Sequence, residues 1–393
     1  MTNRKKIVIV NNNLVTGGVQ KSLVNLLNEI KDKYEVTLFL FSNTGEYKKS
    51  IPHQVKVIEA NPFLKLLGIS QKQSLKEGLL HYFLRSLLVL WTKVFNNYYP
   101  FKFLVLTQKK LKDFDIAISY LHSSNDKLFY GGCNEFVLDR TEAKKRIAFV
   151  HCDYLSYGGN TKKNKEIYKK FDVVATVSNG CRENLARAIP ELITRTVYVR
   201  NFHNYKSIVK IANESPIVYP SNFFNIVTVA RLSPEKGIIR TIYIIKKLLA
   251  ENYRIKWHLI GDGPQRAEIE RLIKTHSLEE NIILHGNQDN PYKYMISADI
   301  FLLPSFHEAA PMVIDESKCL SLPVITTNTI SAKEMIKENK EGFVCNNNER
   351  DLYKEIKKIL DNPDLITKCK DFLKAQSYTN KNSLEQFSQI IDN

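Results

Sequence analysis

Cysteine is scarce in this 393-residue sequence, and its spacing argues against two cysteine-dependent classes of protein. The six cysteines are scattered and form no Cys-x-x-Cys pair. This pattern disfavours a zinc ribbon and provides no disulfide framework. A reducing cytoplasm is the compartment that we expect. The six residues are Cys133, Cys152, Cys181, Cys319, Cys345 and Cys369.

Long apolar runs and nucleotide-binding glycine motifs are missing as well. The first apolar run has only four residues before Asn11, fewer than a signal peptide needs, so we expect a first strand there. The uncharged run 86–92 is far shorter than the roughly 20 residues of a membrane-spanning helix. The second half contains neither Gly-x-Gly-x-x-Gly nor Gly-x-x-x-x-Gly-Lys-Ser/Thr, which excludes an NAD fingerprint and a P-loop there.

Positive charge is in excess, with a net charge of +16, and one segment carries half of it. Residues 63–112 hold nine basic residues and one acidic residue, Glu77, and therefore carry +8. Aromatic and apolar residues are interleaved with these charges. This pattern is typical of segments that lie on an anionic membrane surface. The basic residues are Lys65, Lys72, Lys76, Arg85, Lys93, Lys102, Lys109, Lys110 and Lys112.

We therefore expect residues 63–112 to make peripheral contact with an anionic membrane, at the inner face of the cell membrane. Two other interpretations stay open at this point, an ordinary core helix with a solvated lysine face and a nucleic-acid patch. No recognisable RNA- or DNA-binding motif accompanies the segment, so we expect no nucleic acid partner.

Apolar, β-rich runs alternate with helical patterns along the whole chain. Such alternation predicts parallel sheets that are covered by helices on both faces. After Gly17-Gly18, the residues Leu23, Leu26, Leu27 and Ile30 follow the spacing of a helix that packs on a sheet. The expected strands span 7–10, 36–41, 55–58, 116–119, 146–150, 173–177, 196–199, 225–229, 256–260, 282–285, 300–303, 324–326 and 342–345.

The chain is long enough for two domains. Residues 205–223 contain Asn, Ser and Pro in clusters that are typical of a linker. We therefore expect domains at 1–205 and 206–376, and a C-terminal helix within 377–393 that packs back on the first domain. The expected fold class is α/β, with two Rossmann-like domains whose parallel sheets face each other across a cleft.

The most informative segment runs from Ser305 to Glu316. Its spacing puts Glu308 in a loop and Glu316 about a turn and a half into a helix that starts at Pro311. Because open α/β sheets bind ligands at the carboxyl ends of their strands, both carboxylates are candidates for binding vicinal hydroxyl groups. Taken alone, the spacing also fits two solvated helix glutamates.

Cations and glycines follow two neighbouring strands of the second half. Arg231 and Lys236 come after the strand at 225–229, and a guanidinium with an ammonium suits a diphosphate. A surface loop with two solvated cations is the alternative. Gly261 and Gly263 follow the next strand, where glycines let a backbone approach a ligand closely.

Candidate residues also follow strands of the first half. Gly17 and Gly18 precede a helix whose N-terminus could face an anion. His151 follows the strand at 146–150, at a position where a histidine is a candidate for function, although a lone histidine is more often structural.

Together these features resemble the retaining nucleotide-sugar glycosyltransferases of family 4, which have the GT-B fold. The resemblance covers most of the chain and is strongest from Asn225 to Thr326. It rests on Val229-Ala-Arg-Leu-Ser-Pro-Glu-Lys-Gly237, Gly261-Asp-Gly-Pro264, and Ser305-x-x-Glu308 with Glu316, followed by Leu322-Pro-Val-Ile325.

The resemblance implies a role for each matching residue. Arg231 and Lys236 would bind the donor diphosphate and stabilise the departing phosphate. Glu308 would hold hydroxyls of the donor sugar and Glu316 those of the ribose. His151 matches a histidine near the sugar, and with Arg231, Lys236 and Glu308 it completes the implied catalytic set. The other implied donor-binding residues are Gly17, Gly18, Asn201, Gly261, Gly263, Ala309, Ala310, Pro311, Met312 and Val313.

The sequence departs from the family pattern at several of these places. Ala309 stands where the family usually has Gly, Ser317 replaces a usual Ala, and Asp315 stands where an apolar residue is common. Phe202-His203 replaces the Gly-Val that follows the family's asparagine. The donor sugar expected from relatives and the ribose contacts are therefore open.

No cofactor and no metal are expected besides the nucleotide sugar that serves as donor substrate, because two cations can neutralise the diphosphate. Asp113-Phe-Asp115 looks like the Asp-x-Asp of metal-dependent transferases. Because it starts an apolar strand, we interpret it as a solvated strand edge.

The sequence thus predicts a retaining hexosyltransferase that moves a sugar from a nucleotide diphosphate sugar, UDP-linked in the simplest case. The expected acceptor is a cell-envelope glycan or a lipid-linked glycan. One alternative is a nucleotide-sugar epimerase with the GT-B fold. Another is a basic binding protein without catalysis, which the set of Arg231, Lys236, Glu308 and Glu316 disfavours.

Overall fold

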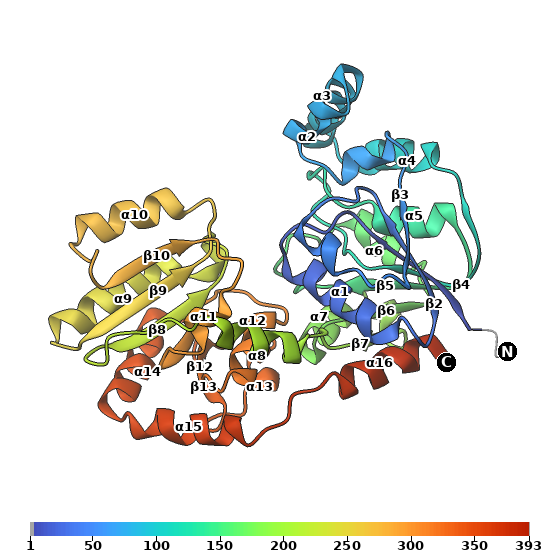
Figure 1. Ribbon diagram of the computed structural model, residues 1–393. Coiled ribbons are helices and arrows are strands. Elements are labelled where there is room, and N and C mark those ends of the chain that lie inside the picture. The colour runs from blue at the N-terminus through green and yellow to red at the C-terminus, as the bar shows by residue number, and fades with distance from the viewer. Residues whose placement is uncertain (1–3, 393) are drawn as a thin grey trace. The chain divides into compact units, whose positions relative to one another are not determined.

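The computed structural model describes residues 4–392, which belong to two compact units (Figure 1). Unit 1 comprises Met1–His203 together with Asn380–Asn393, and unit 2 comprises Asn204–Thr379. Each unit contains one parallel sheet with helices on both of its faces. The expected α/β class and the parallel sheets are confirmed.

The sheet of unit 1 has the strand order β3-β2-β1-β4-β5-β6-β7, and every pairing in it is parallel. The order runs from β1 to β3 on one side of β1 and from β4 to β7 on its other side, so it reverses between β1 and β4. The strands are β1 (Lys6–Asn11), β2 (Glu35–Leu40), β3 (Lys56–Glu59), β4 (Leu111–Ser119), β5 (Thr141–Val150), β6 (Val173–Thr176) and β7 (Thr196–Tyr198).

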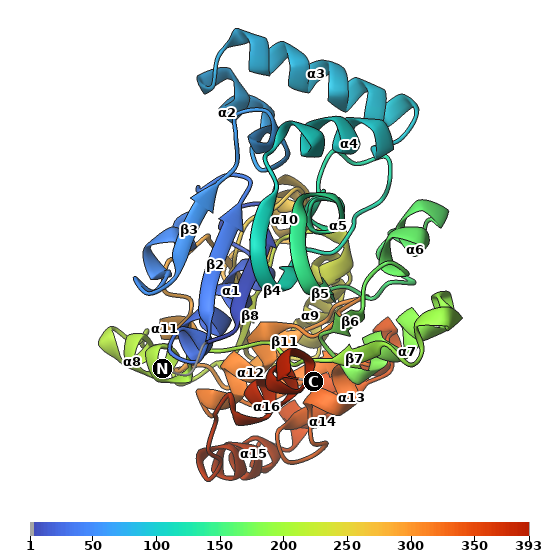
Figure 2. The same ribbon diagram turned by 90° about the vertical axis from the view of Figure 1, so that its right-hand side faces the viewer.

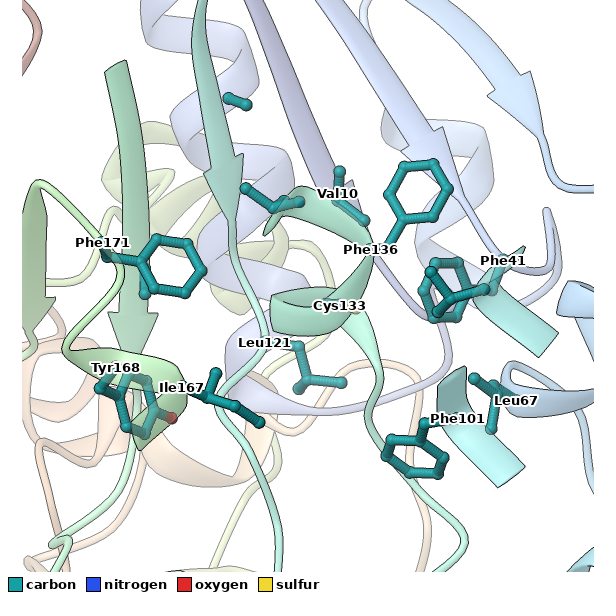
Figure 3. Close-up of a cluster of buried hydrophobic side chains, with 14 of the residues drawn as sticks. Val10, Phe41, Leu67, Phe101, Leu121, Cys133, Phe136, Ile167, Tyr168 and Phe171 are labelled. Atoms are coloured by element: carbon teal, nitrogen blue, oxygen red, sulfur yellow. The ribbon is translucent and has the colours of Figure 1, made fainter. Parts of the chain in front are cut away.

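Side chains of β1 alternate between two cores. Ile7 and Ile9 lie in the core that α1 (Gly18–Ile30) and α16 (Lys381–Asp392) cover. Val8 and Val10 lie in the opposite core, and Figure 3 shows Val10 among side chains from the helices of that face. Those helices are α4 (Tyr98–Thr107), α5 (Cys133–Arg140) and α6 (Lys162–Tyr168). The period of two along a strand therefore builds both faces.

The remaining elements of unit 1 lie in its connections. Three of them, η2, α2 and α3, belong to the basic segment between β3 and β4. The elements are η1 (Glu46–Ser50), η2 (Leu64–Leu67), α2 (Gln71–Lys76), α3 (Leu79–Val94), α7 (Asn179–Ala188) and η3 (Pro190–Leu192).

The sheet of unit 2 has the parallel order β10-β9-β8-β11-β12-β13, and its strand order reverses between β8 and β11. Ligands of open α/β sheets bind at such reversals, outside the carboxyl ends of the strands. The strands are β8 (Phe224–Val229), β9 (Ile255–Ile260), β10 (Ile282–Gly286), β11 (Ile300–Leu303), β12 (Val324–Thr327) and β13 (Gly342–Cys345).

Helices cover this sheet on both faces as well. One core contains side chains of α9 (Ile238–Ala250), α10 (Arg266–Thr275), α14 (Glu349–Asp361) and α15 (Asp364–Lys374). The opposite core contains side chains of α8 (Tyr205–Glu214), α11 (Tyr292–Met295) and α12 (Met312–Cys319). Two short helices complete the unit, η4 (Pro234–Lys236) and α13 (Ala332–Met335).

Three local expectations need correction. The stretch 205–223 is not a linker throughout, because α8 occupies its first half, is capped by Asn204, and buries Ile208 and Ala212. The helix after Glu308 starts at Met312, and Pro311 precedes it with an extended ψ of 120°. Strands β4 and β5 also begin five residues before the expected positions, because Leu111 and Phe114 pair with Thr141 and Ala143 in a charged extension.

Two further observations concern classes of structure that the sequence disfavours. All six cysteines are free thiols. None of the helices between residues 4 and 392 combines the length and the apolar character that crossing a bilayer requires.

Candidate functional site

Two loops at the carboxyl ends of β8 and β9 pack directly on each other. A Cβ atom on Gly261, whose φ is 135°, would lie 2.0 Å from the carbonyl oxygen of Ala230. A Cβ atom on Gly263 would lie 2.3 Å from the carbonyl oxygen of Leu232. The backbone N–H of Leu232 donates to the backbone carbonyl oxygen of Asp262 at 3.0 Å. In the structure these glycines let two protein loops approach each other closely, and their expected contact with a ligand stays a prediction.

The loop after β8 packs in the same way on the loop after β11. Gly237 has a φ of 66°, and a Cβ atom there would lie 2.1 Å from the carbonyl oxygen of Pro304. The N–H of Phe306 donates to the carbonyl oxygen of Glu235 at 2.7 Å. These contacts fix the two loops on either side of the point where the strand order reverses, and they bring Lys236 next to Glu308.

Lys236 and Glu308 form a largely buried ion pair. Their side chains are 20% and 9% exposed, and Lys236 Nζ lies 2.6 Å from Glu308 Oε1. The hydroxyl of Ser305 donates to the same oxygen at 2.7 Å. Oε2 of Glu308 makes no hydrogen bond with the residues that the structure describes. The carboxylate is therefore held in one orientation through one oxygen, and the other can accept hydrogen bonds from a ligand.

Arg231 differs from Lys236 in its surroundings. Its side chain is exposed, and its guanidinium has neither a hydrogen bond nor an ion pair within residues 4–392. Arg231 is the second residue after β8, and its guanidinium therefore offers five N–H donors to an anion at the carboxyl end of that strand.

Arg240 is a supporting residue that the sequence analysis missed. It is 6% exposed, and its Nη2 donates to Pro304 O at 2.6 Å and to Asn347 Oδ1 at 2.7 Å. Its guanidinium lies 3.8 Å from the ring centre of Phe306, and burial lowers its pKa. The sequence pattern could have indicated Arg240, because it lies on the buried face of α9, where an arginine must have hydrogen-bond partners. Arg240 fixes the loop that carries Glu308.

Glu316 lies on α12 and is 3% exposed. Its neighbour Asp315 forms an ion pair with Lys318 at 3.0 Å, and Lys318 also reaches Glu341 at 3.5 Å. Burial lowers the pKa of Lys318, but the charges of Asp315 and Glu341 outweigh it and raise the pKa above its ordinary value. Asp315 therefore balances the charge of Lys318. Ser317 is buried, and its hydroxyl donates to Leu322 O at 2.9 Å.

The segment 309–313 leads into the first turn of α12. Pro311 precedes the helix, and no side chain caps its first-turn N–H groups. Backbone N–H groups at a helix N-terminus favour an anion.

In unit 1, Gly17 and Gly18 lie at the start of α1, close to the carboxyl end of β1. Gly17 precedes the helix, no side chain caps it, and Gly18 is its first residue. A Cβ atom on Gly17 would lie 2.6 Å from Oε1 of Gln20. This helix N-terminus lies beside the reversal between β1 and β4.

Two histidines, the buried His122 and the partly buried His151, follow the neighbouring strands β4 and β5. Nε2 of His151 and both ring nitrogens of His122 are buried and have no hydrogen-bond partner within residues 4–392. Burial lowers the pKa of His151 to about 3, with a smaller contribution from His122, and lowers the pKa of His122 to about 4. Both imidazoles are therefore neutral near pH 7, and each can exchange a hydrogen bond with a hydroxyl group.

The sequence analysis missed His122. Its position could have indicated it, because His122 closely follows β4, and the strand order reverses between β1 and β4. Tyr120, on the same segment, lies 4.7 Å from His151 between ring centres. Its hydroxyl lies 3.1 Å from Ser22 Oγ on α1. The two histidines therefore lie against a region of unit 1 that is built from β4, β5 and α1.

Asn201 lies in unit 1, in the segment that follows β7. Phe202 is buried against Phe387 of α16, with 6.2 Å between ring centres, and its N–H donates to Ser22 Oγ at 3.1 Å. The N–H of His203 donates to Asn380 Oδ1 at 3.0 Å. Packing against α16 explains why a large aromatic residue replaces the family's glycine after Asn201.

Asp113 and Asp115 lie toward the amino end of β4, the end opposite to His122. Asp115 accepts the N–H of Lys6 at 2.9 Å and binds Lys144 at 2.7 Å. Asp113 is exposed, with a φ of 65°. Both residues therefore lie in the first half of β4, where Asp113 is solvated and Asp115 is engaged by two lysines. No cluster of three or more His, Cys, Asp or Glu side chains within residues 4–392 is arranged to hold a metal ion.

Comparison with known proteins shows which family the second part of the chain resembles. Residues 212–376 match the family described as Glycosyl transferases group 1. A Campylobacter jejuni protein is 24% identical over 392 residues, which is 95% of each chain, and is named N-acetylgalactosamine-N,N'-diacetylbacillosaminyl-diphospho-undecaprenol 4-alpha-N-acetylgalactosaminyltransferase. An uncharacterized glycosyltransferase of Methanocaldococcus jannaschii is 25% identical over 253 residues, and the matched part is 58% of this chain and 61% of that protein.

The fold comparison extends over both units. Anabaena HepE in complex with UDP matches 98% of this chain and 99% of its own, with a TM-score of 0.68 and 15% identity. This likeness is one of fold, and the architecture in question is GT-B. The family match covers most of unit 2, and a relative with 24% identity spans nearly the whole sequence, so the chain is similar to the Glycosyl transferases group 1 family.

Proposed function

We propose that the protein is a retaining glycosyltransferase that moves a sugar from a UDP-linked donor to a cell-envelope or lipid-linked glycan acceptor. The observation that carries the proposal is the ion pair of Lys236 and Glu308 beside the uncommitted Arg231, where the strand order of unit 2 reverses. Two relatives support the substrates. HepE was crystallised with UDP and with UDP-glucose, and the Campylobacter relative is named for a diphospho-undecaprenol acceptor.

Unit 2 binds the donor in this proposal. When the bond to the anomeric carbon breaks, negative charge grows on the β-phosphate of the leaving nucleotide. Arg231 and Lys236 stabilise that charge, and they are in position before the reaction starts because the close contact of Gly237 with Pro304 holds the loop after β8. The N–H groups in the first turn of α12, those of Met312 and Val313 among them, add a favourable dipole at the same diphosphate.

The two glutamates bind hydroxyl groups of different parts of the donor. Lys236 and Ser305 occupy Oε1 of Glu308, so Oε2 accepts from hydroxyls of the donor sugar. The ammonium of Lys236 retains donors for a phosphate while it bonds to Glu308. Glu316, buried on α12, accepts from the ribose hydroxyls. Gly261 and Gly263 act indirectly, because they let the β8 and β9 loops pack together.

Unit 1 supplies the acceptor site. His151 and His122 are neutral imidazoles with unused ring nitrogens, so they orient sugar hydroxyls and carry no charge into the site. We also propose that Gly17 and Gly18, at the N-terminus of α1, and Asn201, in the segment after β7, have the donor-binding roles that the family resemblance implies.

Product analysis with a panel of UDP-sugars and a lipid-diphosphate-linked glycan tests the proposal. Transfer with retained anomeric configuration, read by NMR of the product, is the expected result. Conversion of the donor to an epimer without an acceptor would replace the proposal with an epimerase. Tight donor binding with no turnover on any acceptor would leave a binding protein.

A further inference from the structure

Helix α3 of unit 1 carries an unusually apolar exposed face. Five residues spaced alternately by three and four positions form one side of the helix, and each is 59% or more exposed. We name this face the apolar stripe. It consists of Leu80, Phe83, Leu87, Leu90 and Val94. Figure 2 shows α3 at the outer end of unit 1, with α4 between it and the sheet.

The opposite side of α3 is anchored, so the stripe faces outward in a fixed orientation. Arg85 donates to Gln71 Oε1 at 2.7 Å and to Leu66 O at 3.3 Å, and its guanidinium lies 5.3 Å from the ring centre of Phe129. Leu84 and Leu88 pack against the core of unit 1. The helix is therefore held by its inner side, and the stripe has no partner among the residues that the structure describes.

Aromatic residues extend this apolar surface beyond the stripe. Trp91 and Phe95 are exposed on α3, and Tyr98, Tyr99 and Phe103 are exposed on or beside α4. Monomeric proteins rarely expose so many adjacent large apolar side chains unless the surface binds something. Tyr and Trp favour the boundary between lipid headgroups and acyl chains.

The charges around the stripe have one sign. No Asp or Glu occurs from Gly78 to Lys112. Lys65 is already neutralised by Glu77 at 2.8 Å and Glu59 at 3.3 Å, and Arg85 faces inward, so neither is available to a partner. Six lysines of the segment have no ion pair within residues 4–392. They are Lys72, Lys76, Lys93, Lys102, Lys109 and Lys110.

The spacing of the stripe would also fit a helix of a second copy, but the charges oppose that occupant. Two copies paired along α3 would bring their lysines together with no carboxylate between them, whereas helix pairs usually match opposite charges beside the apolar seam. An anionic bilayer offers both an apolar layer for the stripe and negative headgroups for the lysines.

We propose that α3 lies in the plane of an anionic membrane, with the apolar stripe at the boundary of headgroups and acyl chains and the six lysines among the headgroups. This arrangement is independent of the proposed reaction, because it uses no residue of the candidate site. The sequence predicts membrane contact for the whole basic and aromatic segment 63–112, and this proposal assigns the contact to one exposed face of α3 and the lysines near it.

Sedimentation with vesicles tests the proposal. The probes are vesicles of phosphatidylcholine alone and of phosphatidylcholine with phosphatidylglycerol. The stripe variant carries Phe83→Ser, Leu87→Ser and Leu90→Ser, and the lysine variant carries Gln at 72, 76, 93 and 102. We expect the wild type to bind anionic vesicles at least tenfold more tightly than neutral ones. The stripe variant should lose at least tenfold in binding, and the lysine variant should lose the preference for anionic vesicles.

Matched controls change the same chemistry elsewhere. Ile193→Ser with Val218→Ser removes two highly exposed apolar side chains, and Gln at Lys206, Lys210, Lys274 and Lys354 removes four exposed charges. Both controls should bind as the wild type does. Trp91 fluorescence should shift to shorter wavelength with anionic vesicles, and Trp91→Phe should abolish the shift while the buried Trp257 remains.

Two results would overturn the proposal. One is wild-type binding that the controls reduce as much as the stripe variant does. The other is a dimer in analytical ultracentrifugation that the stripe variant dissociates, with no binding to either vesicle, which would assign the stripe to a second copy. Circular dichroism establishes that each variant is folded. None of these readouts depends on catalysis, so failure of the proposed reaction would leave this test unaffected.

Discussion

A single carboxylate oxygen, Oε1 of Glu308, accepts from Lys236 at 2.6 Å and from Ser305 at 2.7 Å. Lys236 comes from the loop after β8, and Ser305 and Glu308 come from the loop after β11. The ion pair therefore joins the two strands between which the strand order of unit 2 reverses. A charged ligand that binds here must share Lys236 with Glu308, so changes at these residues should affect turnover more than folding.

Removing either cation of the β8 loop should slow the reaction. Arg231→Ala and Lys236→Ala should each lower kcat by about 10²–10³-fold, the scale for losing one preorganised contact to the transition state. The measurement is steady-state turnover of the UDP-sugar. Arg254→Ala, which removes an exposed arginine at the amino end of β9, is the control and should change little. Near-normal turnover in both loop variants, with the fold intact, would remove the diphosphate assignment.

The two glutamates should differ in their kinetic effects. Glu316→Gln should raise the KM of the donor more than it lowers kcat, which is the pattern of lost ground-state binding. Glu308→Gln should mainly lower kcat, because its carboxylate contacts the sugar as the bond breaks and holds Lys236 in place. Initial rates over a range of donor concentrations separate the two effects. The opposite pattern would exchange the two roles.

Each expected strand corresponds to one of β1–β13, because continuous apolar runs between turn residues are a direct consequence of burial on both faces. The apolar pattern that predicts a strand was weaker where the strand extends beyond the helices that cover the sheet. The start of β5, around Lys144 and Lys145, is charged and pairs only with β4, so the apolar rule placed its beginning five residues late. The helix α8 was missed because Asn, Ser and Pro residues near it are typical of a linker. The burial of its residues Ile208 and Ala212 depends on contacts with residues that are distant in sequence.

The candidate site could be predicted only as far as local motifs extend. Lys236 and Glu308 were selected from separate motifs, but their contact depends on two loops meeting 72 residues apart in the chain. Arg240 and His122 carry no motif, and their importance follows from burial and from missing or internal partners. Gly261 was selected for close approach to a ligand, and the atom that excludes a side chain there in the structure is the carbonyl oxygen of Ala230.

The reaction should not require a divalent metal. Arg231 and Lys236 provide positive charge for the diphosphate, and Asp115 is engaged by Lys6 and Lys144 at the amino end of β4. Turnover should therefore persist in excess EDTA, and Asp113→Asn with Asp115→Asn should leave the response to EDTA unchanged. Loss of activity that only Mg²⁺ or Mn²⁺ restores would contradict this expectation and reopen the Asp-x-Asp interpretation.

Acid should destabilise the protein through His122. Its folded-state pKa is about 4, because burial disfavours the charged imidazole, whereas an unfolded histidine titrates near about 6.5. Below about pH 6.5 the unfolded chain gains a proton that the folded chain does not, so this contribution to stability is complete above that pH and is lost as pH falls toward 4. At about 1.4 kcal/mol per pH unit, the loss between pH 6.5 and 5 is about 2 kcal/mol.

His122→Gln removes this titration, so its thermal midpoint should fall less on acidification than that of the wild type. For a unit of this size, about 2 kcal/mol corresponds to a difference of about 4–8 °C in the change of Tm between pH 7 and pH 5. Differential scanning calorimetry at both pH values measures it. His53→Gln, which changes an exposed histidine of the same unit, is the control and should follow the wild type. Parallel changes of Tm in all three proteins would mean that the buried imidazole of His122 is protonated in the folded state near pH 5.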